Sequence, residues 1–402
     1  MLKISNRIRS IKPSPHRALI AQADEDRRKG YDVINFTAGQ PGLPPMLDAV
    51  KAFIEEFLKD PFKHSKYLPT PGLYDLKVEI CKDLKRYGGV DVVPEEVLIT
   101  AGGVEAINLA LSVVTDPGDE VFFLDPCYSV YWGLAKYLGL KVVSCPQTID
   151  RGFQPDPECI KEKITSRTAA ILFASPDNPT SRIIDEEVIK TMADLAMDKK
   201  VWFIYDEAYK HIVYEGGHVW IHNYGNIRDY LISINSFSKD LAIPGFRVGY
   251  VYGPKEVIKE MTKLKGFTSI TTPTPSQYLA YYYLSRGLKG RYLSYALSVY
   301  RERREVMAEA LRKYLPEAKF IKPKASMYYF PDISSYLSKL GMDDVEFCYD
   351  LGRVKHVYIL PGSIFGPSGR GHVRITFVTQ PPDRIKEGIS RINEYLRERG
   401  VM

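Results

Sequence analysis

The sequence predicts an α/β protein with a doubly wound, mostly parallel central sheet and a second, smaller α+β domain. Between Val97 and Val251, short apolar runs typical of strands alternate with longer stretches of helical spacing, as in a parallel sheet covered by helices. After a long helical stretch at Leu288–Tyr314, short strand-like runs return between helices, which indicates the second domain. We therefore expect an N-terminal arm with a small-domain segment at residues 1–45, a large domain at 46–285 and a small domain at 286–402.

Composition and charge exclude several classes of protein. The 402 residues are 45% hydrophobic, which suits two domains with their own cores. The 55 Lys and Arg are scattered among 49 Asp and Glu, so no basic groove for nucleic acid is indicated. No signal-like core and no run of about 18 apolar residues occurs, so we expect a cytoplasmic protein without a membrane partner. The five cysteines form no C-x-x-C pair, which predicts reduced thiols, and we predict no metal site.

The N-terminal stretch offers two candidate residues. A short predicted strand ends in a turn at residues 34–41 (INFTAGQP), where Gly39 allows the backbone to approach a ligand closely. A helix is predicted from Leu47 to Leu58, and Tyr67 then precedes a loop with proline and glycine and a further helix. From the residues alone, Gly39 could belong to any turn and Tyr67 could be a packed ring.

The predicted strand at residues 97–100 leads directly into a helix that begins with two glycines. The backbone N–H groups of Gly102, Gly103 and Val104 would be unpaired at the positive end of the helix dipole. Such a helix start is an anion site, and a phosphate is one anion that fits it. A double glycine at a helix start is weak support for this interpretation when taken alone.

Three more strands are predicted at residues 121–124, 169–173 and 201–205. Tyr128, Asn178 and Asp206 follow or end these strands, at the edge where ligands of open α/β sheets bind. A carboxylate such as Asp206 can keep a nearby ligand nitrogen protonated, and Tyr209 can bind a ligand oxygen. The alternatives are a packing contact for Tyr128 and a helix cap for Asp206.

The next stretch, Ser233–Tyr250 (SINSFSKDLAIPGFRVGY), contains hydroxyls, a lysine and an arginine after a strand-like run. A lysine between two buried strands should have a lowered pKa, so that its amine can condense with an aldehyde. Ser236 and Arg247 can bind a phosphate. An aldehyde that carries a phosphate is pyridoxal phosphate, and Lys239 is the candidate to bind it. The alternative is a solvated lysine in a turn.

One arginine of the C-terminal part interrupts an apolar strand. Arg374 stands among Val373, Ile375 and Phe377, and a buried arginine without a carboxylate partner is costly. The residues leave two interpretations open, an ion pair inside the protein or a ligand carboxylate.

The motif S-x-S-K followed by G-x-R-x-G-Y, from Ser236 to Tyr250, resembles the lysine signature of class I aminotransferases. These enzymes depend on pyridoxal phosphate, have fold type I, and include the prokaryotic aspartate and aromatic aminotransferases. The resemblance extends from GQP at Gly39 to RITF at Arg374. It implies fold type I, and a Lys239 that binds the cofactor as an imine and then transfers a proton as base and acid.

The resemblance assigns a role to each candidate. It implies that the cofactor phosphate is bound by Gly102, Gly103, Val104, Ser236 and Arg247. It implies that the cofactor ring is bound by Tyr128, Asn178, Asp206 and Tyr209, and the substrate α-carboxylate by Gly39, Asn178 and Arg374. Tyr67 matches a tyrosine that crosses a dimer interface to the partner's cofactor phosphate, which implies a homodimer.

The expected function is therefore transfer of an amino group between an L-amino acid, with an aspartate or aromatic donor favoured, and a 2-oxo acid such as 2-oxoglutarate. A lyase of the same fold, either a carbon–sulfur β-lyase or similar to aminocyclopropane-carboxylate synthase, would share these motifs. A regulator that binds the cofactor would need a DNA-binding segment, and residues 1–30 do not fit one. Residues 267–277 contain no second arginine for a dicarboxylate, and Ser181 stands where the family motif N-P-T-G has glycine.

Overall fold

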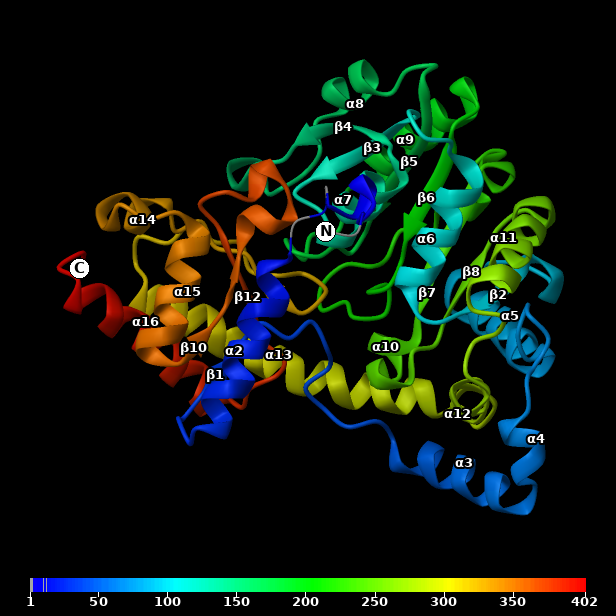
Figure 1. Cartoon of the computed structure of the whole chain (residues 1–402), viewed down its shortest axis with the longest axis horizontal. Coiled ribbons are helices and arrows are strands. Elements are labelled where there is room, and N and C mark those ends of the chain that lie inside the picture. The colour runs from blue at the N-terminus through cyan, green and yellow to red at the C-terminus, as the bar shows by residue number, and fades with distance from the viewer. Residues whose placement is uncertain (1–2, 10, 12) are drawn as a thin grey trace.

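A seven-stranded sheet with the strand order β2-β8-β7-β6-β5-β3-β4 forms the centre of the protein (Figure 1). The computed structural model describes residues 3–9, 11 and 13–402. The strands are β2 (Val97–Thr100), β3 (Glu120–Asp125), β4 (Lys141–Pro146), β5 (Thr168–Ala174), β6 (Trp202–Asp206), β7 (Leu231–Ser236) and β8 (Gly249–Tyr252). Strand β8 is antiparallel to both of its neighbours, and the other pairings are parallel. The predicted mostly parallel sheet is confirmed.

Helices cover both faces of this sheet because apolar side chains point alternately to its two sides. Val121 and Phe123 of β3 belong to one apolar core, whereas Phe122 and Leu124 belong to the other. The first core is closed by α6 (Gly103–Val114), α7 (Ser129–Leu138) and α11 (Lys255–Thr268). The second includes residues of α5 (Tyr74–Gly88), α8 (Pro157–Lys163), α9 (Glu186–Lys199) and α12 (Thr274–Ser285). This arrangement is the predicted doubly wound fold.

The direction of β8 explains how a distant arginine reaches the ligand-binding edge. Six strands point the same way, so their carboxyl ends share one edge of the sheet. Because β8 runs the opposite way, its first residue, Gly249, pairs with Ser236 and Thr100 at the ends of β7 and β2. Arg247, two residues earlier, therefore lies at the same edge.

The C-terminal part contains a three-stranded sheet, β11 (Leu360–Pro361)-β12 (Val373–Thr376)-β9 (Tyr328–Tyr329), with α14 (Ser334–Leu340), α15 (Asp344–Lys355) and α16 (Pro382–Glu398). The predicted long helix is α13 (Leu288–Tyr314), which runs from α16 towards α12 (Figure 1). Near the N-terminus, β1 (Ile34–Asn35) pairs in parallel with β10 (Val357–Tyr358), and α2 (Pro15–Arg28) contacts α15. Residues 15–35 thus pack with the C-terminal part, whereas the domain limits stay a prediction.

Three further helices lie outside the sheet layers. They are α1 (Asn6–Arg9), α3 (Leu47–Lys59) and α4 (Pro61–Ser65), and Figure 1 shows α3 and α4 at the lower right, beyond α12. The predicted helix from Leu47 is confirmed in α3. None of the helices in the described ranges is both long and apolar enough to cross a lipid bilayer.

Two of the cysteines form a disulfide, so the prediction that all five are reduced is wrong. Cys145 lies in β4 and Cys159 in α8, and the packing of these elements brings the two Cα atoms within 6.0 Å. This separation is in the range that a disulfide can bridge. The sequence separation of 14 between the cysteines gave no sign of the contact, because spacing alone does not show which elements pack together. The cytoplasmic location, which rested partly on reduced cysteines, stays a prediction.

Candidate active site

A cavity of about 190 Å³ lies at the carboxyl edge of the central sheet, where β9 and β12 of the C-terminal part meet it. Most of the residues predicted from the sequence line it, namely Gly39, Gly103, Val104, Tyr128, Asn178, Asp206, Tyr209, Ser236, Lys239, Arg247 and Arg374. Gly102 adjoins the lining through Arg247. Tyr67 does not line the cavity, and its side chain is exposed to solvent.

Lys239 is placed by a sharp change from strand to helix. The short helix α10 (Phe237–Asp240) begins directly after β7, and the Ser236 hydroxyl caps it by accepting a hydrogen bond from the Ser238 N–H at 3.2 Å. The Lys239 ammonium donates a hydrogen bond to the carbonyl oxygen of Gly39. Burial lowers the pKa of Lys239 to about 8, and the charges of Arg374 and Arg247 act in the same direction. The amine is therefore neutral, and nucleophilic, in mildly alkaline solution.

Asp206 ends β6 and has two hydrogen-bond donors. Its Oδ2 accepts a bond of 2.7 Å from the Tyr131 hydroxyl, and its Oδ1 accepts one of 3.0 Å from the backbone N–H of Ala208. Burial raises the pKa of Asp206 to about 6, while the bond from Tyr131 opposes this rise. Tyr131 was not predicted. Its signal was its position three residues after Tyr128, the N-cap residue of α7, and the centroids of the two rings are 5.7 Å apart.

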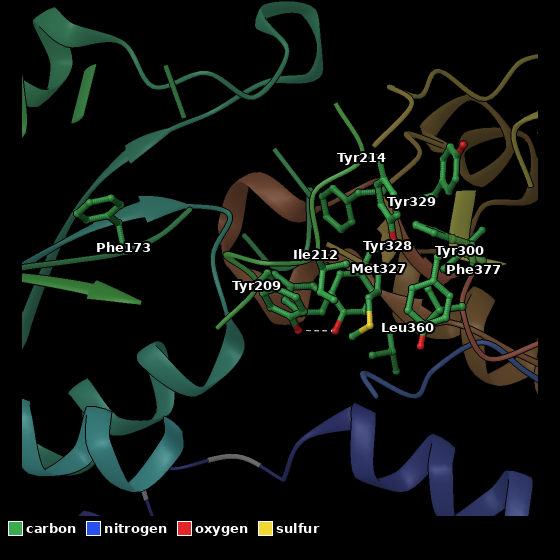
Figure 2. Packing of buried hydrophobic residues seen from close by; sticks show 14 of the residues in the cluster. Phe173, Tyr209, Ile212, Tyr214, Tyr300, Met327, Tyr328, Tyr329, Leu360 and Phe377 are labelled. Atoms are coloured by element: carbon green, nitrogen blue, oxygen red, sulfur yellow. Dashed lines mark hydrogen bonds between the residues drawn. The ribbon is translucent and has the colours of Figure 1, made fainter. Parts of the chain in front are cut away.

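Two tyrosines from different parts of the chain meet in the cavity. The Tyr209 and Tyr328 hydroxyls are 2.6 Å apart, and Figure 2 shows this hydrogen bond as a dashed line. Tyr328 lies in β9, and the guanidinium of Arg374 stacks over its ring at 4.3 Å. Sequence reasoning missed Tyr328 because nothing in the apolar run MYYF distinguishes a ring that faces a ligand from a core ring. Tyr328 thus links Tyr209 to the arginine.

Arg374 is a buried cation whose charge no carboxylate of the described residues neutralises. Its side chain is 2% exposed. One Nη donates a bond of 2.9 Å to Asn178 Oδ1, and the other donates one of 2.6 Å to the carbonyl of Thr37. Its buried Nε has no hydrogen-bond partner in the described ranges. Of the two interpretations of Arg374, the internal ion pair is therefore not found among residues 3–9, 11 and 13–402, and a ligand carboxylate remains.

The other end of the cavity is suited to an anion. The helix α6 begins here, with Gly102 as its N-cap residue and with Gly103 and Val104 lining the cavity. Arg247 donates to two backbone carbonyls, of Pro244 at 2.9 Å and of Ala101 at 3.4 Å, and forms no ion pair with a carboxylate of the described chain. A Cβ atom on Gly102, whose φ is +79°, would lie 2.6 Å from Arg247 Nη2. The absence of that carbon lets the guanidinium approach the helix start.

Ser181 has a backbone conformation that glycine adopts more readily than serine. Its φ is +59°, in the left-handed region, and the side chain is buried. The hydroxyl accepts a hydrogen bond of 3.1 Å from the backbone N–H of Tyr328. Ser181 therefore adds a contact to β9 that glycine could not make.

Comparison with known proteins gives the family. Residues 31–392 match the family described as aminotransferase class I and II. The chain belongs to this family. It is 31% identical to the probable aspartate/prephenate aminotransferase of Thermus aquaticus over 99% of this chain and 100% of that protein. It is 33% identical to the aspartate aminotransferase of Pyrococcus horikoshii, over 98% and 97% of the two chains.

Solved structures agree with this assignment. The aspartate aminotransferase of Thermus thermophilus, solved with maleate, superimposes with a TM-score of 0.90 at 30% identity, over 98% of this chain and 100% of that one. The aspartate aminotransferase of Thermotoga maritima gives a TM-score of 0.88 at the same identity and coverage. The predicted fold type I and the predicted aminotransferase class are confirmed.

Proposed function

We propose that this aminotransferase uses pyridoxal phosphate to move an amino group between an L-amino acid and a 2-oxo acid such as 2-oxoglutarate, with aspartate or an aromatic amino acid as the favoured donor. The observation that carries the proposal is the pairing of Lys239 with Arg374 in one cavity. The Lys239 amine, whose pKa is lowered, donates a hydrogen bond to the Gly39 carbonyl. The buried Arg374 guanidinium, which has no carboxylate partner in the described chain, donates to the Thr37 carbonyl two residues earlier. Relatives named for aspartate or prephenate support the donor class.

The residues of the cavity fit the cofactor. Lys239 matches its aldehyde, and the amides of Gly103 and Val104 together with Arg247 match its phosphate. Asp206, held by Tyr131, would face the pyridine nitrogen. When bound, pyridoxal phosphate supplies an electron-withdrawing ring that weakens the bond between Cα and its hydrogen in an attached substrate.

The protein's own residues then position the substrate and move one proton. Arg374 binds the α-carboxylate through the guanidinium N–H groups that do not donate to Asn178 or Thr37, including the Nε that is unpaired among the described residues. Asn178 fixes the orientation of the guanidinium. This clamp places Cα near Lys239. The Lys239 amine would remove the proton from Cα and return it to the carbon of the cofactor's aldehyde group, and its pKa of about 8 suits a group that both accepts and donates a proton.

We also propose a homodimer in which Tyr67 reaches the cofactor phosphate of the partner subunit. Tyr67 is 81% exposed, and large apolar side chains are also exposed on α3, α4 and α11, including Phe267 at 88%. Exposed apolar side chains of this kind commonly mark a subunit interface. Light scattering of the purified protein should give twice the chain mass of 45.7 kDa.

The decisive experiment is a single half-reaction. The cofactor-loaded protein is mixed with aspartate, tyrosine or phenylalanine without any 2-oxo acid acceptor, and the released 2-oxo acid is measured. We expect no more than one equivalent for each active site, because the enzyme then holds the amino group until an acceptor arrives. The Lys239→Ala variant should release none.

Two outcomes would contradict the proposal. Repeated turnover of an amino acid with sulfur on Cβ, such as cystathionine, to a thiol, pyruvate and ammonia without an acceptor would establish the carbon–sulfur lyase alternative. Release of 2-oxo acid by Lys239→Ala at the wild-type rate would show that another group moves the proton.

A further inference from the structure

His16 is a basic group of the cavity that the proposed reaction leaves without a role. It lies in the first turn of α2, after Pro15, and it lines the cavity beside Arg374, Tyr128 and Asn178. Its ring is hydrogen-bonded to the backbone of Thr37. Its Nε2 is buried and has no hydrogen-bond partner within the described part of the chain. A buried ring nitrogen without a partner is costly unless a ligand satisfies it.

The other basic groups of the cavity already have ligands in the proposed function. Arg374 binds the α-carboxylate, Arg247 binds the phosphate, and Lys239 binds the cofactor. The lining contributed by the described residues contains no other lysine, arginine or histidine than these and His16. If a substrate brings a second carboxylate, His16 is therefore the side chain that can neutralise it among the described residues that line the cavity.

Burial and the positive charges around His16 favour the neutral ring when no substrate is bound. Burial lowers the pKa of His16 to about 4, and the positive charges of Arg374 and, more weakly, Arg17 act in the same direction. The remaining charged or titratable groups of the cavity are Lys239, Arg247, Asp206, Tyr128, Tyr131, Tyr209 and Tyr328. An α-carboxylate on Arg374 offsets the charge that opposes protonation, and a second carboxylate beside His16 favours it directly. A dicarboxylate thus creates the conditions under which the imidazole gains a proton.

We propose that His16 selects the substrate side chain by protonation, so that it binds the second carboxylate of a dicarboxylic acid as an imidazolium and meets an uncharged side chain as a neutral ring. The proton comes from solvent and returns to it when the ligand leaves. A neutral imidazole packs against an aromatic ring without the desolvation cost of a permanent arginine charge. One residue can then serve both donor classes, and this inference rests on the proposed function.

Two probes that differ by a single carboxylate test the proposal. Succinate and butyrate have the same chain length and carry no amino or oxo group, so they bind without reacting. Their dissociation constants are measured on the cofactor-loaded protein from about pH 6.5, where carboxylates are already ionised, to about pH 8.5. We expect the dissociation constant of succinate to rise with pH by up to tenfold per unit more than that of butyrate. Effects of Lys239 and the cofactor are common to both probes and cancel in the comparison.

Proton uptake gives a second readout. Calorimetry in two buffers of different ionisation enthalpy should show up to one more proton bound with succinate than with butyrate or 3-phenylpropanoate. His16→Gln should abolish this difference while binding of 3-phenylpropanoate persists, which also shows that the variant is folded. His222→Gln is the matched control, because His222 is another buried histidine, has a ring nitrogen without a hydrogen-bond partner among the described residues, and lies outside this cavity. It should keep the difference.

The possible outcomes distinguish a failure of the His16 inference from a failure of the proposed function on which it rests. Equal pH dependence of the two probes in the wild-type protein, or an unchanged difference in His16→Gln, would overturn the role of His16 and would indicate a permanent charge, such as one from a partner subunit. Failure of all three probes to bind, with no half-reaction on aspartate, tyrosine or phenylalanine, would instead overturn the proposed function. If His16→Gln does not fold, the pH dependence of succinate and butyrate binding to the wild-type protein still tests the inference, because equal pH dependence would overturn it.

Discussion

Asn178 and Arg374 are 196 residues apart in the sequence, yet the Asn178 side-chain oxygen accepts a hydrogen bond of 2.9 Å from the guanidinium. The bond connects the loop after β5 to β12, so the central sheet and the C-terminal sheet share one polar contact in the cavity. Because Thr37 binds the other Nη, the guanidinium is fixed before any substrate arrives. A clamp that is already oriented loses little freedom on binding.

Replacing Arg374 with lysine keeps a positive charge but removes the fork that binds a carboxylate. Hydrogen bonds to charged groups contribute about 1.5–3 kcal/mol each, so losing the fork should lower kcat/KM for aspartate at least about a hundredfold. Steady-state kinetics on the purified variant measure this. A loss of less than about threefold would show that the α-carboxylate binds elsewhere.

Gly102→Ala should weaken cofactor binding more than backbone strain explains. The new Cβ would lie 2.6 Å from Arg247 Nη2 and would displace the guanidinium. Gly89→Ala is the control for a positive φ, since Gly89 has a φ of +66° and no atom of the described residues lies within 4 Å of the added carbon. The ψ of Gly89 is 16°, in the left-handed helical region, whereas the ψ of 175° at Gly102 lies in a region that essentially only glycine adopts. Gly102→Ala should therefore lose more stability than the roughly 1 kcal/mol expected for Gly89→Ala, and the cofactor dissociation constant should rise at least about tenfold in Gly102→Ala alone. Equal affinities in the two variants would remove Arg247 from the phosphate site.

Asp206→Asn should stabilise the cofactor-free protein while it abolishes activity. The folded-state pKa of about 6 lies above the ordinary 3.8, so the folded state binds more protons between these values and stability falls as pH rises through them. Above pH 6 the charged Asp206 therefore costs the folded state up to about 3 kcal/mol, which asparagine avoids. Urea unfolding at several pH values tests this. The gain should shrink towards pH 4, and a gain that is independent of pH would refute the explanation.

Two substitutions at Ser181 should have different effects on stability. Ser181→Ala removes the hydrogen bond to the Tyr328 N–H and leaves a buried donor unpaired, at a cost of about 1–3 kcal/mol. Ser181→Gly loses the same bond but relieves the left-handed conformation, which returns about 1 kcal/mol. The glycine variant should unfold at the higher temperature. The reverse order would mean that the loop does not hold this conformation in solution.

The sequence predicts those residues of the candidate site that belong to a recognisable local pattern. Asp206 at a strand end, two glycines at a helix start and Arg374 in an apolar strand are each visible within a few residues. The antiparallel direction of β8 is not visible in this way, and it is what brings Arg247 to the same edge as the ends of β2 and β7.

The residues that were missed depend on contacts between distant parts of the chain. His16 lies in an ordinary amphipathic helix, and its approach to the cavity follows from the packing of α2 against the C-terminal part. Tyr328 and the Cys145–Cys159 pair likewise became visible only once the packing of separate elements was known. No periodicity within one segment reports such contacts.

The pairing of β1 with β10 affects the order in which parts of the candidate active site can form during synthesis. Residues 34–39 leave the ribosome early, but their partners lie at Val357–Tyr358 and in β12, and Thr376 donates a hydrogen bond of 3.0 Å to the Phe36 carbonyl. The central sheet, complete by Tyr252, can form while this early segment is still unpaired. A chain that stops before residue 374 can therefore contain Lys239 and the residues of this chain that are proposed to bind the cofactor phosphate, yet it lacks the Arg374 guanidinium that is proposed to bind the substrate α-carboxylate.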